Sequence, residues 1–494
     1  MFEWFNNLVN AGVSLIWGNN DWLIMNNPWY GLLVFLLIGA GLYFTVVTRF
    51  IQFRHFFHMW GLLKSSGQGR KDGGISSFEA LMTSLAARVG TGNLAGVAIA
   101  IYLGGPGAVF WMWMTAILGM STSFIESSLA QAYKIPHTDN VYRGGPAYYI
   151  QEGLKMRWLA ILFALCLLMA FGLAFNGVQA NTIAQATREA FNVPEWITGL
   201  VLVALVAPIV FGGMRSVARV AGKVVPLMAI LYILLALFII VTNFSQFPAA
   251  IAHIFKSAFG LEQAAGGVLG YGIAQAMING IKRGLFSNEA GMGSAPNAAA
   301  AAKTSPNHPA TQGFMQMLGV FMDTLVICTA TASIIILSGV VNPDVEQEGI
   351  QLTQFALSQY VGDMGVYFVA IAIFFFSFTS IIANYSYGES NIEFIAGDKN
   401  AKWAVMLLRV ALLAMVFVGS MASLPAVWNF ADLSMGLMAI INLIAILWLS
   451  PVALRILRDY ENQVKAGKSP EQITFDPDKF IKLKSEANRE AWDD

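Results

Sequence analysis

The chain has 494 residues, of which 56% are hydrophobic and only 12% are charged. An ordinary soluble domain carries about 25% charged residues, so a chain of this length with so few charges does not cover a water-facing surface. The composition therefore excludes a soluble globular protein and indicates a surface that faces lipid. The formal net charge is zero, which gives no sign of a nucleic-acid or other strongly charged partner.

Stretches that are apolar enough to cross a bilayer recur along the chain. A helix needs about 20 mostly apolar residues to cross the bilayer core, and about eleven such stretches are present. Residues 1–29 precede them as a predicted amphipathic segment at the membrane–water interface, because Trp4, Trp17 and Trp22 are of a type that favours it. Residues 456–494 are hydrophilic and are predicted to form a solvated cytoplasmic tail. We predict an all-α membrane protein with transmembrane helices at residues 30–50, 78–104, 107–133, 158–184, 195–213, 220–243, 265–287, 311–338, 364–388, 403–421 and 431–455.

The basic residues lie almost entirely in alternate loops. With the N-terminus placed outside, the outer loops contain only Arg188 and Lys256, and the outer loop near 340–363 has several acids and no base. Because cytoplasmic loops retain Lys and Arg, we expect the N-terminus outside and the C-terminus in the cytoplasm. A multi-pass protein of this kind is expected in the plasma membrane, which in a bacterium is the inner membrane.

One predicted span, 78–104, contains the polar, glycine-rich stretch Gly90-Thr91-Gly92-Asn93. Unpaired backbone groups in the hydrocarbon core cost several kcal/mol each, so a broken helix is tolerated only where it is buried in protein or lines a wet cavity. The freed amides of one half-helix suit a carboxylate, and the freed carbonyls of the other suit a small cation. The alternative is that these glycines only permit close helix packing.

A second predicted span contains a similar feature at a matching position. When the first span is set aside, the other ten form two sets of five, at 78–243 and 265–455. The first span of the second set carries glycines between Gly270 and Gly280, together with the polar residues Gln275 and Asn279. Interrupted segments at corresponding places in two inverted halves indicate the binding site of a transporter.

Five sequence blocks carry a family resemblance. They are AARVGTGNLAGV from Ala86, GGPGAVFWMW from Gly104, YRGGPAYY from Tyr142, GLFSNEAGMGSAP from Gly284 and HPATQG from His308. In this order they resemble the alanine or glycine:cation symporter family, the sodium:alanine symporters. The resemblance implies a LeuT-like fold of two inverted five-helix repeats with one extra N-terminal helix. It also implies symport of alanine, glycine or a similar small neutral amino acid with Na⁺ into the cell by alternating access.

The wider fold group has a hydrophobic residue followed by Gly-x-Gly-Asn at its first broken helix, which the residues from Val89 to Asn93 match. The match implies that the amides near Thr91 and Gly92 bind the substrate carboxylate. It also implies that the side-chain oxygen of Asn93 contacts the substrate or an ion beside it.

The same resemblance implies a Na⁺ site. Its ligands are the carbonyls of Ala86 and Val89 together with the paired hydroxyls of Thr379 and Ser380 on the eighth core helix. Arg88 departs from the wider group, since it places a full charge beside the break.

Other residues are candidates with open alternatives. Gln179 lies on a polar face of its span and either lines the substrate cavity or bonds between helices. Gln275 and Asn279 are assigned to the substrate site through the second interruption. Phe375 either closes over the substrate or packs against lipid. Arg88 is costly at this depth unless it is paired, so we expect a structural or gating salt bridge to one of its candidate partners, Glu126, Asp323 and Glu289.

Three other functions are weighed. A membrane enzyme is not expected, because the five histidines fall in loops or at span ends and form no metal-ligand pattern. A channel would carry rings of charge or repeated filter loops, and we find none in the sequence. Proton coupling remains an alternative to Na⁺, with the acids Glu126, Asp323 and Asp432 as candidate proton carriers.

Overall fold

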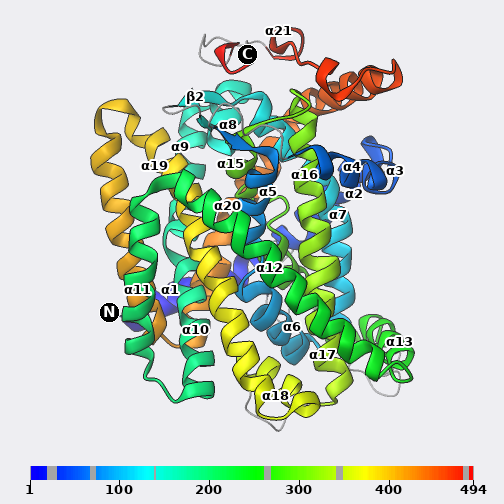
Figure 1. Ribbon diagram of the computed structural model, residues 1–494, viewed down its shortest axis with the longest axis vertical. Coiled ribbons are helices and arrows are strands. Elements are labelled where there is room, and N and C mark those ends of the chain that lie inside the picture. Colours follow the sequence, from blue (N-terminus) through cyan, green and yellow to red (C-terminus); the bar gives the residue numbers. More distant parts are fainter. Residues whose placement is uncertain are drawn as a thin grey trace.

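The structure is a computed structural model that describes residues 2–18, 31–66, 74–137, 141–260, 269–340, 349–481 and 489–492. Long helices lie side by side in one thick bundle (Figure 1). We call one end of the bundle the hairpin end; it carries β2 (Ile135–His137), α8 (Pro146–Leu154) and the C-terminal segment. The opposite end, which carries α13 (Phe247–Ala258) and α18 (Ile350–Val361), is called the α18 end.

The remaining helices of the first half follow one another in the bundle. They are α1 (Phe2–Trp17), α2 (Leu32–Val47), α3 (Ile51–Arg54), α4 (Phe56–Ser65), α5 (Ser77–Arg88), a π-helical turn (Gly92–Gly96), α6 (Val97–Gly104), α7 (Gly107–Ala132), α9 (Arg157–Leu167), a π-helical segment (Leu168–Ala174), α10 (Phe175–Phe191), α11 (Glu195–Phe211) and α12 (Gly213–Thr242).

The helices of the second half include one that reverses direction, since α19 consists of two helices joined at Gly397, whose φ is 65°. The elements are α14 (Leu269–Asn288), α15 (Ala295–Ala300), α16 (Pro309–Val320), a π-helical segment (Phe321–Cys328), α17 (Thr329–Ser338), α19 (Met364–Met421), α20 (Leu424–Lys465), a 3₁₀ turn (Pro470–Gln472) and α21 (Pro477–Phe480).

The predicted all-helical membrane fold is confirmed, and each predicted transmembrane range overlaps a helix. In the described part of the chain, seven helices are long and apolar enough to cross a membrane, or eight if the bent pair α5 and α6 counts as one span. The helices α2 and α11 are apolar but shorter. The count of about eleven spans, which rested on length and apolarity, is therefore not confirmed.

Two short strand pairs lie at the hairpin end. β1 (Ile75–Ser76) pairs in parallel with β4 (Ala302–Lys303), and β2 pairs with β3 (Val141–Arg143) as an antiparallel hairpin. Since β1 precedes α5 and β4 follows α15, the first pair ties two neighbouring helix ends together. α5 itself begins with a capping box, in which Ser76 accepts from the Glu79 amide and Glu79 accepts from the Ser76 amide, an arrangement that satisfies amides at a helix start.

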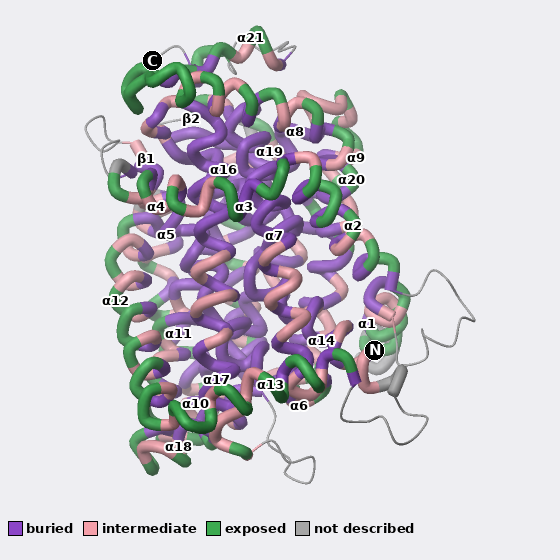
Figure 2. The backbone as a smooth tube through the Cα atoms, turned by 90° about the vertical axis from the view of Figure 1, so that its right-hand side faces the viewer, coloured by how far each residue is buried: buried purple, intermediate pink, exposed green. Residues whose placement is uncertain are grey.

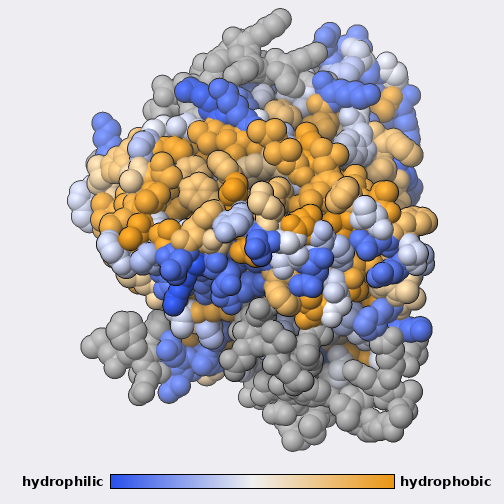
Figure 3. All heavy atoms as spheres, turned by 60° about the horizontal axis from the view of Figure 1, so that its bottom comes forward, coloured by the Kyte–Doolittle hydropathy of each residue, from blue (hydrophilic) through white to orange (hydrophobic). Residues whose placement is uncertain are grey.

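The distribution of side chains fits a protein surrounded by lipid. Buried residues fill the middle of the bundle and exposed ones lie on its outer helices (Figure 2). Hydrophobic side chains cover a broad area of the flank, with hydrophilic side chains toward the ends (Figure 3). On α12, Leu231 and Phe238 are 52% and 56% exposed, a cost in water that a lipid surrounding removes.

The terminal segments differ from the prediction. Trp17 is fully buried and its indole N–H donates to the carbonyl of Asp432 at 3.0 Å, so its side chain packs inside the protein and does not face lipid headgroups. Trp22 and the side chain of Trp4 lie outside the described residues. In the C-terminal tail, Phe475 and Trp492 are buried and their rings are 4.9 Å apart. The tail therefore packs partly on the hairpin end, because its apolar residues find a surface there, and is not solvated throughout.

Candidate functional site

The predicted interruption at Gly90 to Asn93 is confirmed as a bend of 49° between α5 and α6. In a continuous helix the Gly90 amide would donate to the carbonyl of Ala86. Here it donates to the side-chain oxygen of Asn93 at 2.9 Å. Asn93 thus satisfies the exposed amide, and the carbonyl of Ala86 becomes available to other groups.

The freed carbonyls face Ser380 on α19. The Ser380 hydroxyl oxygen lies 2.8 Å from the carbonyl oxygen of Ala86 and 3.4 Å from that of Val89. Three oxygens from two helices therefore converge, and such hard, neutral oxygens suit a small cation. Thr379 donates instead to the carbonyl of Phe376 on its own helix at 2.9 Å. Of the predicted hydroxyl pair, Ser380 alone contacts the break.

The amide side of the break faces α10. The side-chain oxygen of Gln179 accepts from the Thr91 amide at 3.0 Å and from the Thr91 hydroxyl at 2.7 Å, and Ser377 lies 2.9 Å from the same hydroxyl. An acceptor oxygen thus occupies the position where a ligand carboxylate would meet this amide. A Cβ at Gly90 would collide with Ser380 and Gln179, so only glycine permits this approach. Gln179 is brought to the break; which ligand it contacts stays a prediction.

A buried carboxyl group lies on the far side of Asn93. The Asn93 amide donates to Asp323 Oδ1 at 2.7 Å and to the Ser287 hydroxyl at 3.1 Å. The other oxygen of Asp323 accepts from Ser287 at 2.8 Å and from Thr324 at 2.7 Å. The sequence pointed to Asp323 only as a partner of Arg88 or a proton carrier, and it missed Ser287.

Aromatic rings cover the break. The Phe286 ring stacks on Phe175 with centroids 4.4 Å apart, and on its other side it meets Trp428 at 4.7 Å. A Cβ at Gly92 would lie 3.0 Å from Phe286, and one at Gly96 would lie 3.6 Å from Trp428. The sequence did not predict this wall, because its rings come from α10, α14 and α20 and share no local motif.

The second interruption was predicted in the wrong place. α14 is helical throughout from Leu269 to Asn288, so there is no break between Gly270 and Gly280. Gly280 instead permits close packing on α7, since a Cβ there would collide with the carbonyl of Ala108. The interruption lies between α14 and α15. Three residues there have left-handed backbone angles: Glu289 (φ 58°), Gly291 (φ 89°) and Gly293 (φ 84°).

Polar side chains hold this second interruption firmly. The carboxylate of Glu126 on α7 accepts from the Gly291 amide at 3.1 Å and from the Asn442 side chain at 2.8 Å. Asn442 also donates to the carbonyl of Gly291 at 3.0 Å and accepts from the hydroxyl of Tyr149. Both the amide and the carbonyl of Gly291 are therefore paired by residues of two other helices.

Two candidate residues lie away from the first break. The Asn279 side chain donates to the backbone and side-chain oxygens of Gln275 at 2.9 and 3.1 Å. At 1.5 Å per residue, Asn279 and Gln275 lie about 12 and 18 Å along α14 from Ser287. Gln275 lies beside Gly104 at the α18 end of α6. The structure does not bring these two residues to the break, because the interruption that would have placed them there does not form.

Phe375 also lies elsewhere. Its side chain is 43% exposed and lines a groove between α12 and α19 on the outside of the bundle. The helical turn that points Ser377 and Ser380 inward turns Phe375 outward, so the prediction that it closes over the substrate is wrong.

Arg88 is buried without the expected salt bridge. Its guanidinium donates to the carbonyl of Gln316 at 3.3 Å and to the Ser123 hydroxyl at 3.5 Å, and it packs against Gly319. Among the described residues, no carboxylate lies within ion-pair distance of it. The carbonyl and the hydroxyl each accept one bond from the guanidinium, its Nε has no partner in the described part of the chain, and the three candidate acids bond to other groups.

Charged residues lie between the aromatic wall of Phe175, Phe286 and Trp428 and the α18 end of the bundle. Arg283 donates to both carboxylate oxygens of Asp432 at 3.1 and 2.8 Å, and Lys282 lies 3.0 Å from the same carboxylate. The Arg283 guanidinium also lies 4.3 Å from the ring of Trp428. This fork-shaped pairing is geometrically specific, so it fixes the ring that covers the break.

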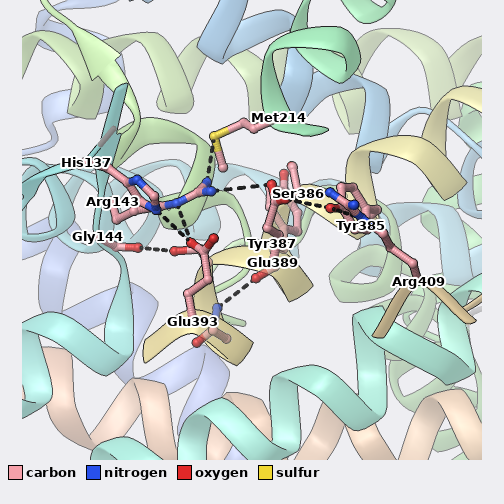
Figure 4. A network of polar contacts seen from close by, with 12 residues as sticks. His137, Arg143, Gly144, Met214, Tyr385, Ser386, Tyr387, Glu389, Glu393 and Arg409 are labelled. Carbon is pink, nitrogen blue, oxygen red and sulfur yellow. Dashed lines mark hydrogen bonds and ion pairs between the residues drawn. The ribbon is translucent and has the colours of Figure 1, made fainter. Parts of the chain in front are cut away.

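A second charged network closes the hairpin end (Figure 4). Arg143 on β3 lies 2.8 Å from Glu393 and 3.4 Å from Glu389, both on α19. Arg409 lies 3.5 Å from Glu389, and His137 lies 3.1 Å from Glu393. The network joins the hairpin after α7 to α19. With Thr91 and Asn93 fully buried, the break is closed toward both ends of the bundle.

Comparisons with known proteins identify the family of the chain. A sequence model of the sodium:alanine symporter family matches residues 19–474. The chain is 49% identical to the amino-acid carrier protein AlsT of Bacillus subtilis, covering 100% of this chain and 99% of AlsT. It is 39% identical to the sodium/alanine symporter AgcS of Methanococcus maripaludis, covering 94% and 99% of the two chains.

The fold also matches a solved structure. The crystal structure of MhsT in complex with L-phenylalanine superposes with a TM-score of 0.54 at 12% identity, covering 76% of this chain and 97% of MhsT. At this identity the likeness concerns the fold alone, which is LeuT-like.

Proposed function

The chain belongs to the sodium:alanine symporter family, and we propose that it is a secondary transporter that couples uptake of alanine, glycine or a similar small neutral amino acid to a cation gradient. The observation that carries this proposal is the first break. Its freed carbonyls converge on Ser380, and its freed amide meets an acceptor oxygen of Gln179. The names of AlsT, an amino-acid carrier, and AgcS, a sodium/alanine symporter, agree with it.

The substrate binds between the break and the aromatic wall in this proposal. Its carboxylate takes the amides near Thr91 and Gly92 and displaces the oxygen of Gln179, which then turns to the substrate. Its side chain packs against Phe286 and Trp428. Because these rings already lie close to the break, only a small side chain fits without moving them.

The coupling cation is Na⁺ in this proposal. Its ligands are the carbonyls of Ala86 and Val89 and the hydroxyl of Ser380. Thr379 joins the set by rotating away from the carbonyl of Phe376. Neutral oxygens of this kind match the ligand preference of hard cations.

A specific observation favours a second cation position or a proton as the alternative coupling ion. Asp323 is fully buried, and it connects to the break through Asn93 and Ser287. An ionisable residue in a membrane segment marks an ion pathway by default. Ionised, the carboxylate would bind a cation together with these polar neighbours; protonated, it would carry the coupling proton itself.

The topology is part of the proposal. Residues 78–243 and 265–455 form two inverted repeats, with 30–50 as an extra helix, and transport proceeds by alternating access between the two closed ends. The N-terminal side is external and residues 456–494 are cytoplasmic. The expected location is the plasma membrane, which in a bacterium is the inner membrane.

Uptake into proteoliposomes tests the function. With radiolabelled alanine and an inward Na⁺ gradient, we expect accumulation above equilibrium, saturation with alanine, and loss of accumulation when choline replaces Na⁺. Accumulation that is unchanged in choline and abolished by a protonophore would establish the proton alternative. Flux that neither saturates nor shows counterflow would contradict a carrier.

A further inference from the structure

A groove of about 430 Å³ runs along the outside of the bundle between α12 and α19. We call it the α12–α19 groove. It is lined by Lys223, Val224, Leu227, Met228, Leu231, Tyr232, Phe368, Ile371, Ala372, Phe375 and Phe376.

Two helical stripes form the walls of the groove. On α12 the lining residues recur at intervals of four, as at Leu227 and Leu231, and on α19 at intervals of three and four, as at Phe368, Ile371 and Phe375; these spacings keep side chains on one face. Leu227 is 61% exposed and Ile371 is 52% exposed. Both helices carry apolar windows long enough to cross a membrane, so a hydrocarbon chain is the complementary occupant of this groove.

Two cations continue the α12 stripe toward the hairpin end. Arg219 and Lys223 lie eight and four residues before Leu227, on the same row of the helix, and both are exposed. Among the described residues neither has an ion pair. The carboxylate of Glu79, whose Cγ would lie 4.0 Å from a Cβ placed on Gly222, is bonded to Ser76.

The position of Lys223 favours an anionic partner. It lies seven residues inside the apolar span that begins at Ser216, about 10 Å along the helix. A lysine at such a depth is costly unless its ammonium reaches the interface or meets an anion. Basic residues at the edge of an apolar groove on the cytoplasmic side are a recognised arrangement for acidic lipid headgroups.

We propose that the α12–α19 groove is a binding site for one anionic phospholipid, with an acyl chain between α12 and α19 and the phosphate on Arg219 and Lys223. Two residues at the bottom of the groove also bond to residues in the interior of the bundle. Tyr232 bonds to Thr331 on α17 at 2.7 Å, and the carbonyl of Phe376 accepts from Ser380 at 3.0 Å. The lipid therefore packs against the turn of α19 that carries Ser380.

Lipid retention on the purified full-length protein tests the site. Phosphatidylglycerol is titrated onto the detergent-solubilised protein and bound lipid is counted by native mass spectrometry, with phosphatidylethanolamine as the neutral comparison. We expect one phosphatidylglycerol to bind more tightly than any phosphatidylethanolamine. The double variant R219Q/K223Q should weaken it by about thirtyfold, because each basic residue contributes about 1 kcal/mol to acidic lipid binding. Leu231→Trp, which fills the groove, should weaken both lipids.

Matched controls keep the result decisive. Lys402→Gln removes an exposed lysine from another apolar span, and Leu234→Trp enlarges an exposed α12 residue outside the groove; both should bind phosphatidylglycerol as the unchanged protein does. Equal affinity for the two lipids, or equal losses in test and control variants, would overturn the proposal and leave only the ordinary lipid annulus. Since the readout is binding, it is independent of which amino acid or ion is transported.

Discussion

At the first interruption, between α5 and α6, the freed backbone groups bond to neutral side chains that a ligand can replace. Gln179 takes the Thr91 amide, and Ser380 takes the carbonyl of Ala86. At the second, between α14 and α15, the freed groups of Gly291 bond to the carboxylate of Glu126 and to the amide group of Asn442. The first bends a membrane span, the second follows the end of α14, and both are buried.

The difference between them lies in what holds the backbone. Glu126 and Asn442 bond to each other as well as to Gly291, so a ligand that displaced either would leave several buried groups unpaired, at about 1–3 kcal/mol each. The first break is instead held by contacts that an ion and a carboxylate can exchange for their own. The second is held by contacts that no ligand replaces cheaply. An interrupted helix thus marks a binding site only where its partners are exchangeable.

The largest effect is expected from Gly90→Ala. The added Cβ would collide with Ser380 and Gln179. The collision would disrupt both the proposed cation site and the proposed site for the substrate carboxylate. Alanine uptake should fall to background while the amount of protein in the membrane stays the same. Gly39→Ala is the matched control, because nothing lies within 4 Å of a Cβ there. Normal uptake by Gly90→Ala would remove the first break from the binding site.

Asn93→Ala should reduce uptake by about 5- to 150-fold, since it removes the partner of the Gly90 amide and of Asp323 Oδ1, at a cost of about 1–3 kcal/mol. Initial rates in proteoliposomes measure the change. Asn429→Ala, which removes an exposed bond to Asn10, should transport normally. If the two variants behave alike, Asn93 has no special place at the break.

Glu126→Gln tests the second interruption. It replaces one of two acceptor oxygens with an amide that faces donors from Gly291 and Asn442, which costs about 1–3 kcal/mol. We expect a lower melting temperature with an unchanged half-saturating Na⁺ concentration. A large change in Na⁺ dependence without loss of stability would make the two interruptions functionally alike.

The smallest effect is expected from Asn279→Leu. Its side chain bonds only to Gln275 on the same helix among its described contacts, so stability and uptake should both change little. A loss of alanine affinity, measured as a raised KM, would restore Asn279 to the substrate site and contradict the observed geometry.

The sequence predicted the first interruption because its signal is local. Gly90, Gly92 and Asn93 fall in the middle of an apolar span, where each is unfavourable without a use. The second was misplaced because Gly270 to Gly280 looked like the same pattern, although Gly280 only allows α14 to approach α7. The true interruption began just after the predicted end of that span and resembled an ordinary loop.

The parts of the site that come from helices far apart in the sequence could not be predicted from it. Phe286, Ser287 and Trp428 reach the break only through the packing of α14 and α20 against it. Whether Phe375 points inward or toward lipid depends on the rotation of α19, which an aromatic run does not specify. The bond from Arg88 to the carbonyl of Gln316 could not be predicted, because every residue has a carbonyl and the sequence does not show which one lies nearby.

In the proposed mechanism the first break holds the ion and the second interruption does not. Alanine binding to purified protein, titrated with Na⁺, measures this directly for the unchanged chain, Ser380→Ala and Glu126→Gln. Ser338→Ala is the control, because its hydroxyl bonds locally, to the carbonyl of Ile335 and the amide of Val340. We predict that Ser380→Ala raises the half-saturating Na⁺ concentration about tenfold, equivalent to about 1.4 kcal/mol, without lowering the melting temperature. The other two variants should keep the Na⁺ dependence of the unchanged chain. An unaltered Na⁺ dependence in Ser380→Ala together with a shifted one in Glu126→Gln would contradict the account.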